Sequence, residues 1–223
     1  MRGVLLIALL VAGCATIPAA ERGIVVTGTG RVMARPDTGI IDVGVEARAP
    51  QLGDATTRVE RTMREVVARV KALGVSDADV RTAVFQIDPI AEPRQPGDDG
   101  ARIVGYRVSN VVRVRARQVD RLGPIADAAV VAGANVVRNI QFTLDDPTRL
   151  EAEARAAAMR AAAEKAAQVA AAAGVRLGRL LSVAESSPLR PEPRVAFQSM
   201  AGPVEPGQLE VTVSVEARYA IEP

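Results

Sequence analysis

The fold is decided by an alanine-rich stretch at 147–173, which reads PTRLEAEARAAAMRAAAEKAAQVAAAA and is followed by Gly174. Alanine fills 14 of the 27 positions, and alanine is the best helix former because ordering it costs no side-chain entropy. Asp146 can cap the helix, Pro147 suits its first position, and Gly174 suits its C-terminal stop. The stretch therefore predicts one long helix.

One side of this helix carries small apolar side chains, which would let it lie close against a sheet. They are Leu150, Ala154, Ala158, Ala162, Ala166, Val169 and Ala173. The other side is charged, and both Arg149–Glu153 and Arg160–Glu164 are i,i+4 pairs of opposite sign. We therefore interpret the helix as a structural element.

The composition excludes several classes of chemistry. The chain has 223 residues, of which 48% are hydrophobic and only 2% aromatic, so its core must be aliphatic. A net charge of +2 gives no global positive charge to predict nucleic-acid binding. There is no histidine and one cysteine, Cys14. Histidine-dependent catalysis, histidine metal ligation, an intramolecular disulfide and a thiolate metal cluster are thereby excluded, and we expect no metal and no cofactor.

The first residues indicate an export signal. A short basic start (MRG) precedes the apolar run VLLIALLV, which is too short to span a bilayer because a spanning helix needs about 20 residues. The run leads into VAGC at 11–14, which resembles the bacterial lipobox, where the cysteine is lipidated and becomes the new N-terminus. We predict a lipoprotein signal at 1–13, a tether at 14–22, and a membrane anchor at Cys14.

The residue after the cysteine bears on the membrane to which the protein is sorted. Ala15 stands where an aspartate would retain a Gram-negative lipoprotein in the inner membrane. The pattern therefore predicts the outer membrane, with the protein facing the periplasm. The alternative is an ordinary signal peptide cut after Ala15 or near Ala19 and Ala20, which would leave a soluble periplasmic protein.

Alternating hydrophobicity and turn residues predict the remaining elements. Strands are expected at 23–33, 38–48, 80–90, 102–117, 136–144, 177–185 and 209–221, and helices at 53–73 and 120–132. The order is then β-β-α-β-β-α-β-α-β-β, which defines an α+β domain at 23–223 with a mostly antiparallel sheet covered by helices. The segments 92–100 and 187–207 are rich in proline, so we expect them to be irregular loops.

Gly28 and Gly30 in the first strand could suggest a phosphate-binding loop. The third glycine of a GxGxxG motif would fall at Met33, and no helix follows. We interpret the two glycines as positions where the strand bends or admits a close neighbour.

The strand expected at 102–117 is basic on one face and apolar on the other. The basic residues are Arg107, Arg113, Arg115 and Arg117. They could bind lipid headgroups, peptidoglycan carboxylates or a protein partner. A separate candidate ligand site is formed by Tyr106, Arg107, Ser109 and Asn110, although we favour interpreting Gly105-Tyr106 as a bend with a buried ring. The interpretation we favour is a solvated sheet face whose arginines pair with neighbours such as Glu46 or Glu216.

Several short motifs follow one another along the chain in a recognisable order. They are Gly28-Thr29-Gly30, Pro36-Asp37, GYRVSN at 105–110, Gly133-Ala134, Glu153-Ala154-Arg155, Ala158, Ala162, Lys165-Ala166 and Gly174. Together they resemble the SIMPL domain family of bacterial envelope proteins, which includes periplasmic immunogenic proteins and proteins linked to oxidative-stress defence. The resemblance covers 24 to about 220. It implies an exported α+β protein, in some members assembled into rings, and it brings no catalytic residues.

We therefore expect a non-enzymatic envelope lipoprotein that acts as a homo-oligomer or by binding partners, with a link to oxidative-stress defence. One alternative is a periplasmic module that binds an anionic ligand through the arginine face. The other is an enzyme built on a carboxylate pair. Its candidates are Asp42, Glu46, Glu185, Glu210 and Glu216, and their spacing in sequence does not show whether they converge.

Overall fold

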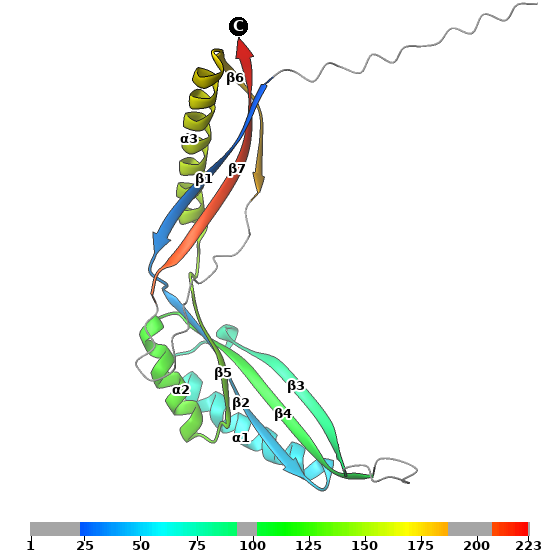
Figure 1. Ribbon diagram of the computed structural model, residues 1–223. Coiled ribbons are helices and arrows are strands. Elements are labelled where there is room, and N and C mark those ends of the chain that lie inside the picture. Colours follow the sequence, from blue (N-terminus) through cyan, green and yellow to red (C-terminus); the bar gives the residue numbers. More distant parts are fainter. Residues whose placement is uncertain (1–22, 93–101, 187–206, 223) are drawn as a thin grey trace, which may run out of the picture.

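The computed structural model describes residues 23–92, 102–186 and 207–222, and in these residues the elements follow the predicted order. They form two lobes joined at a narrow waist (Figure 1). The predicted signal and tether, with Cys14, lie outside the described residues. So do most of the two proline-rich loops.

The smaller lobe is a three-stranded antiparallel sheet with one helix along it. Its strands are β1 (Gly23–Ala34), β6 (Arg176–Ser186) and β7 (Leu209–Glu222), and its helix is α3 (Thr148–Ala173). The strand order is β1-β7-β6, so the first and last strands of the chain lie side by side (Figure 1). β1 and β7 pair without interruption, from Gly23 opposite Ala220 to Ala34 opposite Leu209.

The larger lobe is a four-stranded antiparallel sheet in the order β3-β4-β2-β5. Its strands are β2 (Thr38–Ala49), β3 (Val80–Ala91), β4 (Ile103–Ala116) and β5 (Val136–Thr143). Helices α1 (Leu52–Ala72) and α2 (Leu122–Val131) cover one face. Single turns of 3₁₀ helix, Asp77–Asp79 and Val119–Arg121, precede β3 and α2.

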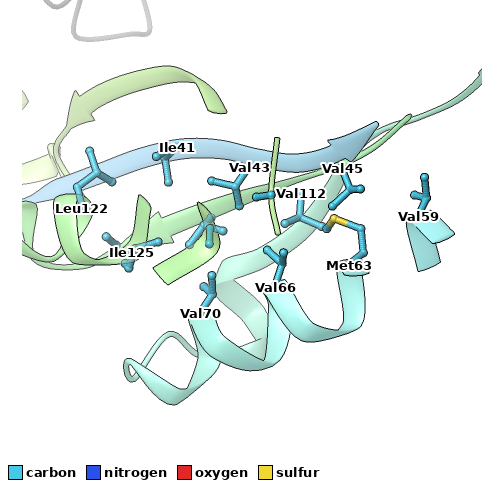
Figure 2. Close-up of a cluster of buried hydrophobic side chains, with 14 of the residues drawn as sticks. Ile41, Val43, Val45, Val59, Met63, Val66, Val70, Val112, Leu122 and Ile125 are labelled. Carbon is cyan, nitrogen blue, oxygen red and sulfur yellow. The ribbon is translucent and has the colours of Figure 1, made fainter. Parts of the chain in front are cut away.

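The core of the larger lobe is aliphatic, as the composition predicted. Val59, Met63, Val66 and Val70 of α1 pack against Ile41, Val43 and Val45 of β2 and against the valines of β4 (Figure 2). α1 packs mainly on β2 and β4. β3 lies at the sheet edge, where Phe85 is 54% exposed.

The alanine-rich helix begins and ends close to the predicted residues. Asp146 Oδ1 accepts a hydrogen bond from the Thr148 backbone nitrogen at 3.0 Å, and Gly174 ends the helix in the left-handed conformation with φ 69°. Arg149 and Glu153 form the predicted ion pair. The helix begins at Thr148 rather than Pro147, which is the N-cap.

Two of the residues predicted on the buried apolar side of α3, Val169 and Ala173, were wrong. The buried residues are Leu150, Ala154, Ala158, Ala162, Ala166 and Ala170. Val169 is 42% exposed, and Ala173 is exposed too. Rows of residues four apart are inclined to the helix axis, and the sheet beneath twists. The contact therefore follows every fourth residue to Ala170 instead of returning to Val169.

Candidate functional site: the arginine face and the junction between the lobes

The four predicted arginines lie on the face of the larger sheet opposite to its helices. Arg107, Arg113 and Arg115 alternate along β4 with buried residues that face the core, and Arg117 directly follows the strand. The buried residues are Val108, Val112, Val114 and Ala116. Asn110 pairs with Val45, whose side chain is in the core, so Asn110 belongs to the helix side of the sheet. Tyr106 has the same parity as Asn110. The proposed grouping of Tyr106 and Asn110 with Arg107 and Ser109 in one site is therefore wrong, because they alternate between two faces.

Asp42 anchors the middle of this face. Arg113 Nε donates to Asp42 Oδ1 at 2.7 Å and Arg113 Nη2 to Oδ2 at 2.9 Å, which is a bidentate pair. The Asn139 amide donates to Oδ2 at 2.7 Å. Asp42 is only 2% exposed. The hydrogen bonds from Arg113 outweigh the opposing effect of burial and hold the pKa of Asp42 below its ordinary value.

Asn139 reaches Asp42 because the backbone of β5 is irregular there. The register between β2 and β5 shifts between Ile40 and Asp42, and Asn139 has φ 55°. Asparagine adopts this left-handed conformation more readily than most residues. No local pattern predicts a role for Asn139, because a bulge depends on how two strands align.

Each predicted arginine has a carboxylate neighbour, as the favoured interpretation expected. Arg107 Nε lies 3.4 Å from Glu46, and Arg117 donates to Asp79 at 2.8 and 3.1 Å. Arg115 contacts Asp145. Glu216 was named as a partner wrongly, because it lies on β7 opposite Thr27 in the other lobe.

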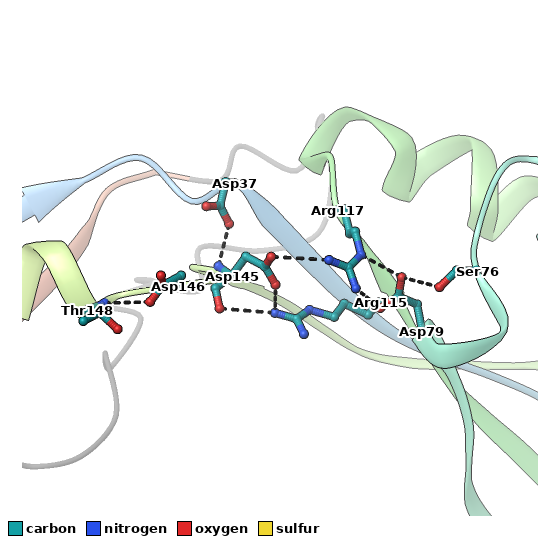
Figure 3. A network of polar contacts seen from close by, with 8 residues as sticks. All are labelled: Asp37, Ser76, Asp79, Arg115, Arg117, Asp145, Asp146 and Thr148. Carbon is teal, nitrogen blue, oxygen red and sulfur yellow. Dashed lines mark hydrogen bonds and ion pairs between the residues drawn. The ribbon is translucent and has the colours of Figure 1, made fainter.

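The arginines at the end of β4 also reach the segments that join the lobes (Figure 3). The Asp145 carboxylate contacts Arg115 and lies 3.5 Å from Arg117, and its backbone nitrogen donates to Asp37 at 2.8 Å. Asp37 and Asp145 lie in the two connections between the lobes. This network therefore ties both connections to one strand of the larger lobe.

Asp79 is the buried end of the same network. It is 7% exposed and accepts hydrogen bonds from Arg117 and from the Ser76 hydroxyl, the latter at 2.8 Å. The hydrogen bond from Arg117, followed by that from Ser76, holds the pKa of Asp79 below its ordinary value despite burial. Asp37, Asp79 and Asp145 were not predicted as partners of these arginines, since no local pattern connects them to β4.

Two further arginines lie on this face. Arg81 on β3 is the register partner of Arg113, and Arg138 on β5 is the register partner of Asp42. Neither forms an ion pair with another residue in the described part of the chain. Across this row, from β3 to β5, three arginines surround one aspartate, and the outer two are exposed.

The carboxylates considered for catalysis are divided between the lobes. Asp42 and Glu46 lie on β2, whereas Glu185, Glu210 and Glu216 lie on β6 and β7. Glu185 accepts from Arg155 at 2.6 and 3.0 Å, and Glu210 lies 3.6 Å from Arg31. Within the described residues, no group of three or more His, Cys, Asp or Glu side chains could hold a metal.

Two hollows lie away from the arginine face. One of about 560 Å³ lies at the waist, where Asp37 and Ile140 meet the start of α2 at Leu122. Another, of about 520 Å³, lies between α1 and the edge of the larger sheet. Its lining includes Met63, Val67 and Asn110.

Among the helices that the structure describes, none is long and apolar enough to cross a membrane.

The fold and the site define an α+β protein of two antiparallel sheets whose arginine face is neutralised in part by ion pairs. The family described as SIMPL, protein of unknown function (DUF541), matches residues 24–219, and the chain belongs to this family. This confirms the resemblance drawn from the short motifs.

Three related proteins illustrate the spread of this family. The "26 kDa periplasmic immunogenic protein" of Brucella melitensis is 33% identical over 213 residues, covering 89% of this chain and 84% of that protein. "Uncharacterized protein YggE" is 29% identical in Edwardsiella ictaluri, with 80% and 74% covered. In Escherichia coli K12 it is 26% identical, with 90% and 83% covered. A solved amidase from Burkholderia phymatum aligns with a TM-score of 0.26 and 16% identity over 63% of this chain and 37% of its own, which carries no argument.

Proposed function

We propose that this protein is a non-enzymatic component of the bacterial cell envelope that acts through self-assembly or partner binding. The observation that carries the proposal is the distribution of exposed side chains. The ionisable groups considered for chemistry are engaged in ion pairs or divided between the lobes, whereas large apolar side chains are exposed on the outer strands of both sheets. They include Val25, Phe85, Ile87, Leu180 and Val183, which are 40–54% exposed. Exposed apolar surface favours association.

The proposed location is the periplasmic side of the outer membrane, with Cys14 as the lipid anchor. The lipobox-like VAGC supports the anchor, and the name of the Brucella relative, a periplasmic immunogenic protein, supports the periplasm. Growth with radiolabelled palmitate followed by membrane fractionation tests it. The wild-type chain is expected to be labelled and to sediment with outer membranes. Cys14→Ala is expected to lose both properties, and label that persists in this variant would contradict the anchor.

The mass of residues 22–223 in solution tests self-assembly. Gel filtration coupled to light scattering is expected to give a defined multiple of the chain mass. A monomer at every concentration would remove self-assembly and leave partner binding.

A role in oxidative-stress defence follows from the family resemblance, and peroxide survival of a deletion strain tests it, with the wild-type gene restoring survival.

A second candidate function is binding of an anionic ligand at the arginine face. Arg81 and Arg138 favour it because both are exposed and neither forms an ion pair within 4 Å in the described residues. Binding to vesicles with anionic headgroups should weaken as salt rises. Arg81→Gln with Arg138→Gln is expected to abolish it, whereas Arg58→Gln with Arg61→Gln on α1 serves as the matched control. Equal binding by both double variants would contradict this candidate.

A further inference from the structure

β3 presents an edge of the larger sheet with no partner among the described strands. The sheet order places β4 on one side of β3 and no described strand on the other (Figure 1). A strand of 12 residues at an edge exposes a row of backbone N–H and C=O groups that can pair with another strand. Natural edges are often protected by charges or covered by a helix, but α1 packs mainly on β2 and β4.

The edge also exposes apolar side chains on the face that carries the core. Phe85 pairs with Asn110 and Ile87 with the buried Val108, which places both on the helix side of the sheet. They are 54% and 43% exposed. The hollow beside α1 reaches Asn110, whose Oδ1 is buried and accepts no hydrogen bond within the described residues. The apolar face of β3 is therefore exposed to solvent beside the hollow next to α1.

The opposite face of β3 carries one charge of each sign. Arg81 is the register partner of Arg113 and Asp88 that of Arg107, so both lie on the arginine face. An odd and an even position share this face because the ladder skips Ala83, between Thr82 and Val84. Asp88 accepts a hydrogen bond from Gln86 at 2.9 Å. Arg81 has no ion-pair partner within the described residues.

We propose that β3 pairs antiparallel with β3 of a second copy, about a two-fold axis at Phe85. This names the surface for the self-assembly proposed above and rests on that proposal. If Ala83 is left unpaired, as it is in the ladder with β4, Arg81 lies opposite Asp88 of the second copy, and Asp88 lies opposite its Arg81. Phe85 meets Phe85, and Ile87 meets Thr82. The strand is thus self-complementary in charge and hydrophobicity, as an isologous interface requires.

Pro89 sets one end of this pairing. It has no backbone N–H and cannot donate to an added strand, which confines the ladder to 81–88. The two four-stranded sheets would then become one sheet of eight strands. The same edge could instead be covered by a part of its own chain outside the described residues or by an unrelated partner, and cross-linking separates these outcomes.

Cross-linking of the full-length chain in the envelope tests the geometry. Phe85→Cys is expected to give a dimer with a short bis-maleimide, because residue 85 lies on the two-fold axis. Ile87→Cys is the matched control. It has similar exposure on the same face but lies away from its own copy, so it is expected to give no dimer. Thr82→Cys combined with Ile87→Cys should restore cross-linking. The wild-type chain controls for Cys14.

Charge reversal in the Phe85→Cys background tests the register. Arg81→Glu places two glutamate–aspartate contacts across the axis, and Asp88→Arg places two arginine–arginine contacts there. Each is expected to reduce cross-linking about tenfold, because like charges opposite one another in a sheet repel. The double variant Arg81→Glu/Asp88→Arg restores opposite charges and should recover the wild-type yield. Circular dichroism and thermal melting confirm that each variant is folded.

The outcomes distinguish this inference from the proposed function. A monomer in light scattering would overturn self-assembly and with it the β3 pairing, and would leave partner binding as the proposed function. An oligomer whose cross-linking at position 85 is absent, or whose single and double charge variants behave alike, would overturn the β3 pairing and leave self-assembly to another surface. A cross-link between position 85 and a different protein would assign the edge to a partner and overturn the pairing.

Discussion

At the scale of single residues, Asp42 decides the role of Arg113. Its carboxylate accepts two hydrogen bonds from Arg113 and one from Asn139, while its side chain is almost fully buried. The guanidinium of Arg113 is partly exposed, with a side-chain exposure of 35%. Arg113 is therefore a structural residue, and any ligand at this face would have to compete with Asp42 or use the outer arginines.

We predict that Asp42→Ala destabilises the larger lobe. The variant leaves Arg113 and Asn139 without their acceptor, which should cost about 2–3 kcal/mol, reduced from a fully buried pair because Arg113 reaches solvent. Glu153→Ala is the control, because it breaks an exposed ion pair on α3 that should be worth less than about 1 kcal/mol. Urea unfolding at neutral pH measures both. Equal losses would contradict the role of Asp42.

The lowered pKa values of Asp42 and Asp79 predict a loss of stability in acid. The carboxylates of Asp42 and Asp79 bind a proton more weakly in the folded state than in the unfolded state, where aspartate titrates at about pH 4. Their contribution is therefore fully present above that pH and is lost as the pH falls through the lowered folded pKa. Asp42→Asn should unfold at a lower urea concentration at neutral pH but lose less stability on acidification. If the free energy of unfolding of Asp42→Asn fell with pH as steeply as that of the wild-type chain, the prediction would be contradicted.

At the scale of elements, two glycines set how closely α3 lies on β1. A Cβ atom at Gly30 would come within 1.9 Å of the Ala154 carbonyl oxygen, and one at Gly28 within 2.1 Å of the Ala158 oxygen. The interpretation that these glycines admit a close neighbour is confirmed. Alanine on the helix and glycine on the strand together bring two backbones into contact.

We predict that Gly30→Ala destabilises the smaller lobe by about 2 kcal/mol or more, because the added methyl group meets helix backbone that cannot move aside. Gly53→Ala in the first turn of α1 is the matched control, since no atom lies within 4 Å of its added Cβ. It should be neutral or slightly stabilising, within about 1 kcal/mol. Thermal unfolding measures both, and a tolerated Gly30→Ala would show that α3 can shift.

At the scale of the whole molecule, the two lobes are held by short connections and a polar network. Asp145 contacts Arg115 of β4 and the following Arg117 through its side chain, and Asp37 through its backbone. Because these ion pairs are partly exposed, they should fix orientation more than they add stability. The relative orientation of the lobes therefore depends on one carboxylate in the second connection.

We predict that Asp145→Ala loosens the waist without unfolding either lobe. Small-angle X-ray scattering should show a broader distribution of intramolecular distances, while the free energy of unfolding changes by less than about 1 kcal/mol. Asp77→Ala, which breaks an exposed pair with Lys71, is the control and should leave the scattering unchanged. Identical scattering from all three proteins would contradict the role of Asp145.

The sequence by itself determined the elements, their order and the aliphatic core, because helix propensity, alternation and turn chemistry are local properties. It also indicated that the arginines would be paired with carboxylates such as Glu46, since antiparallel sheets often leave one charged face solvated. Only the tertiary structure decided that the strands form two sheets, that β1 joins β7 from the far end of the chain, and that Asp79, Asn139 and Asp145 meet the arginines. Such pairings depend on which distant segments bury each other's faces, and no local pattern records that choice.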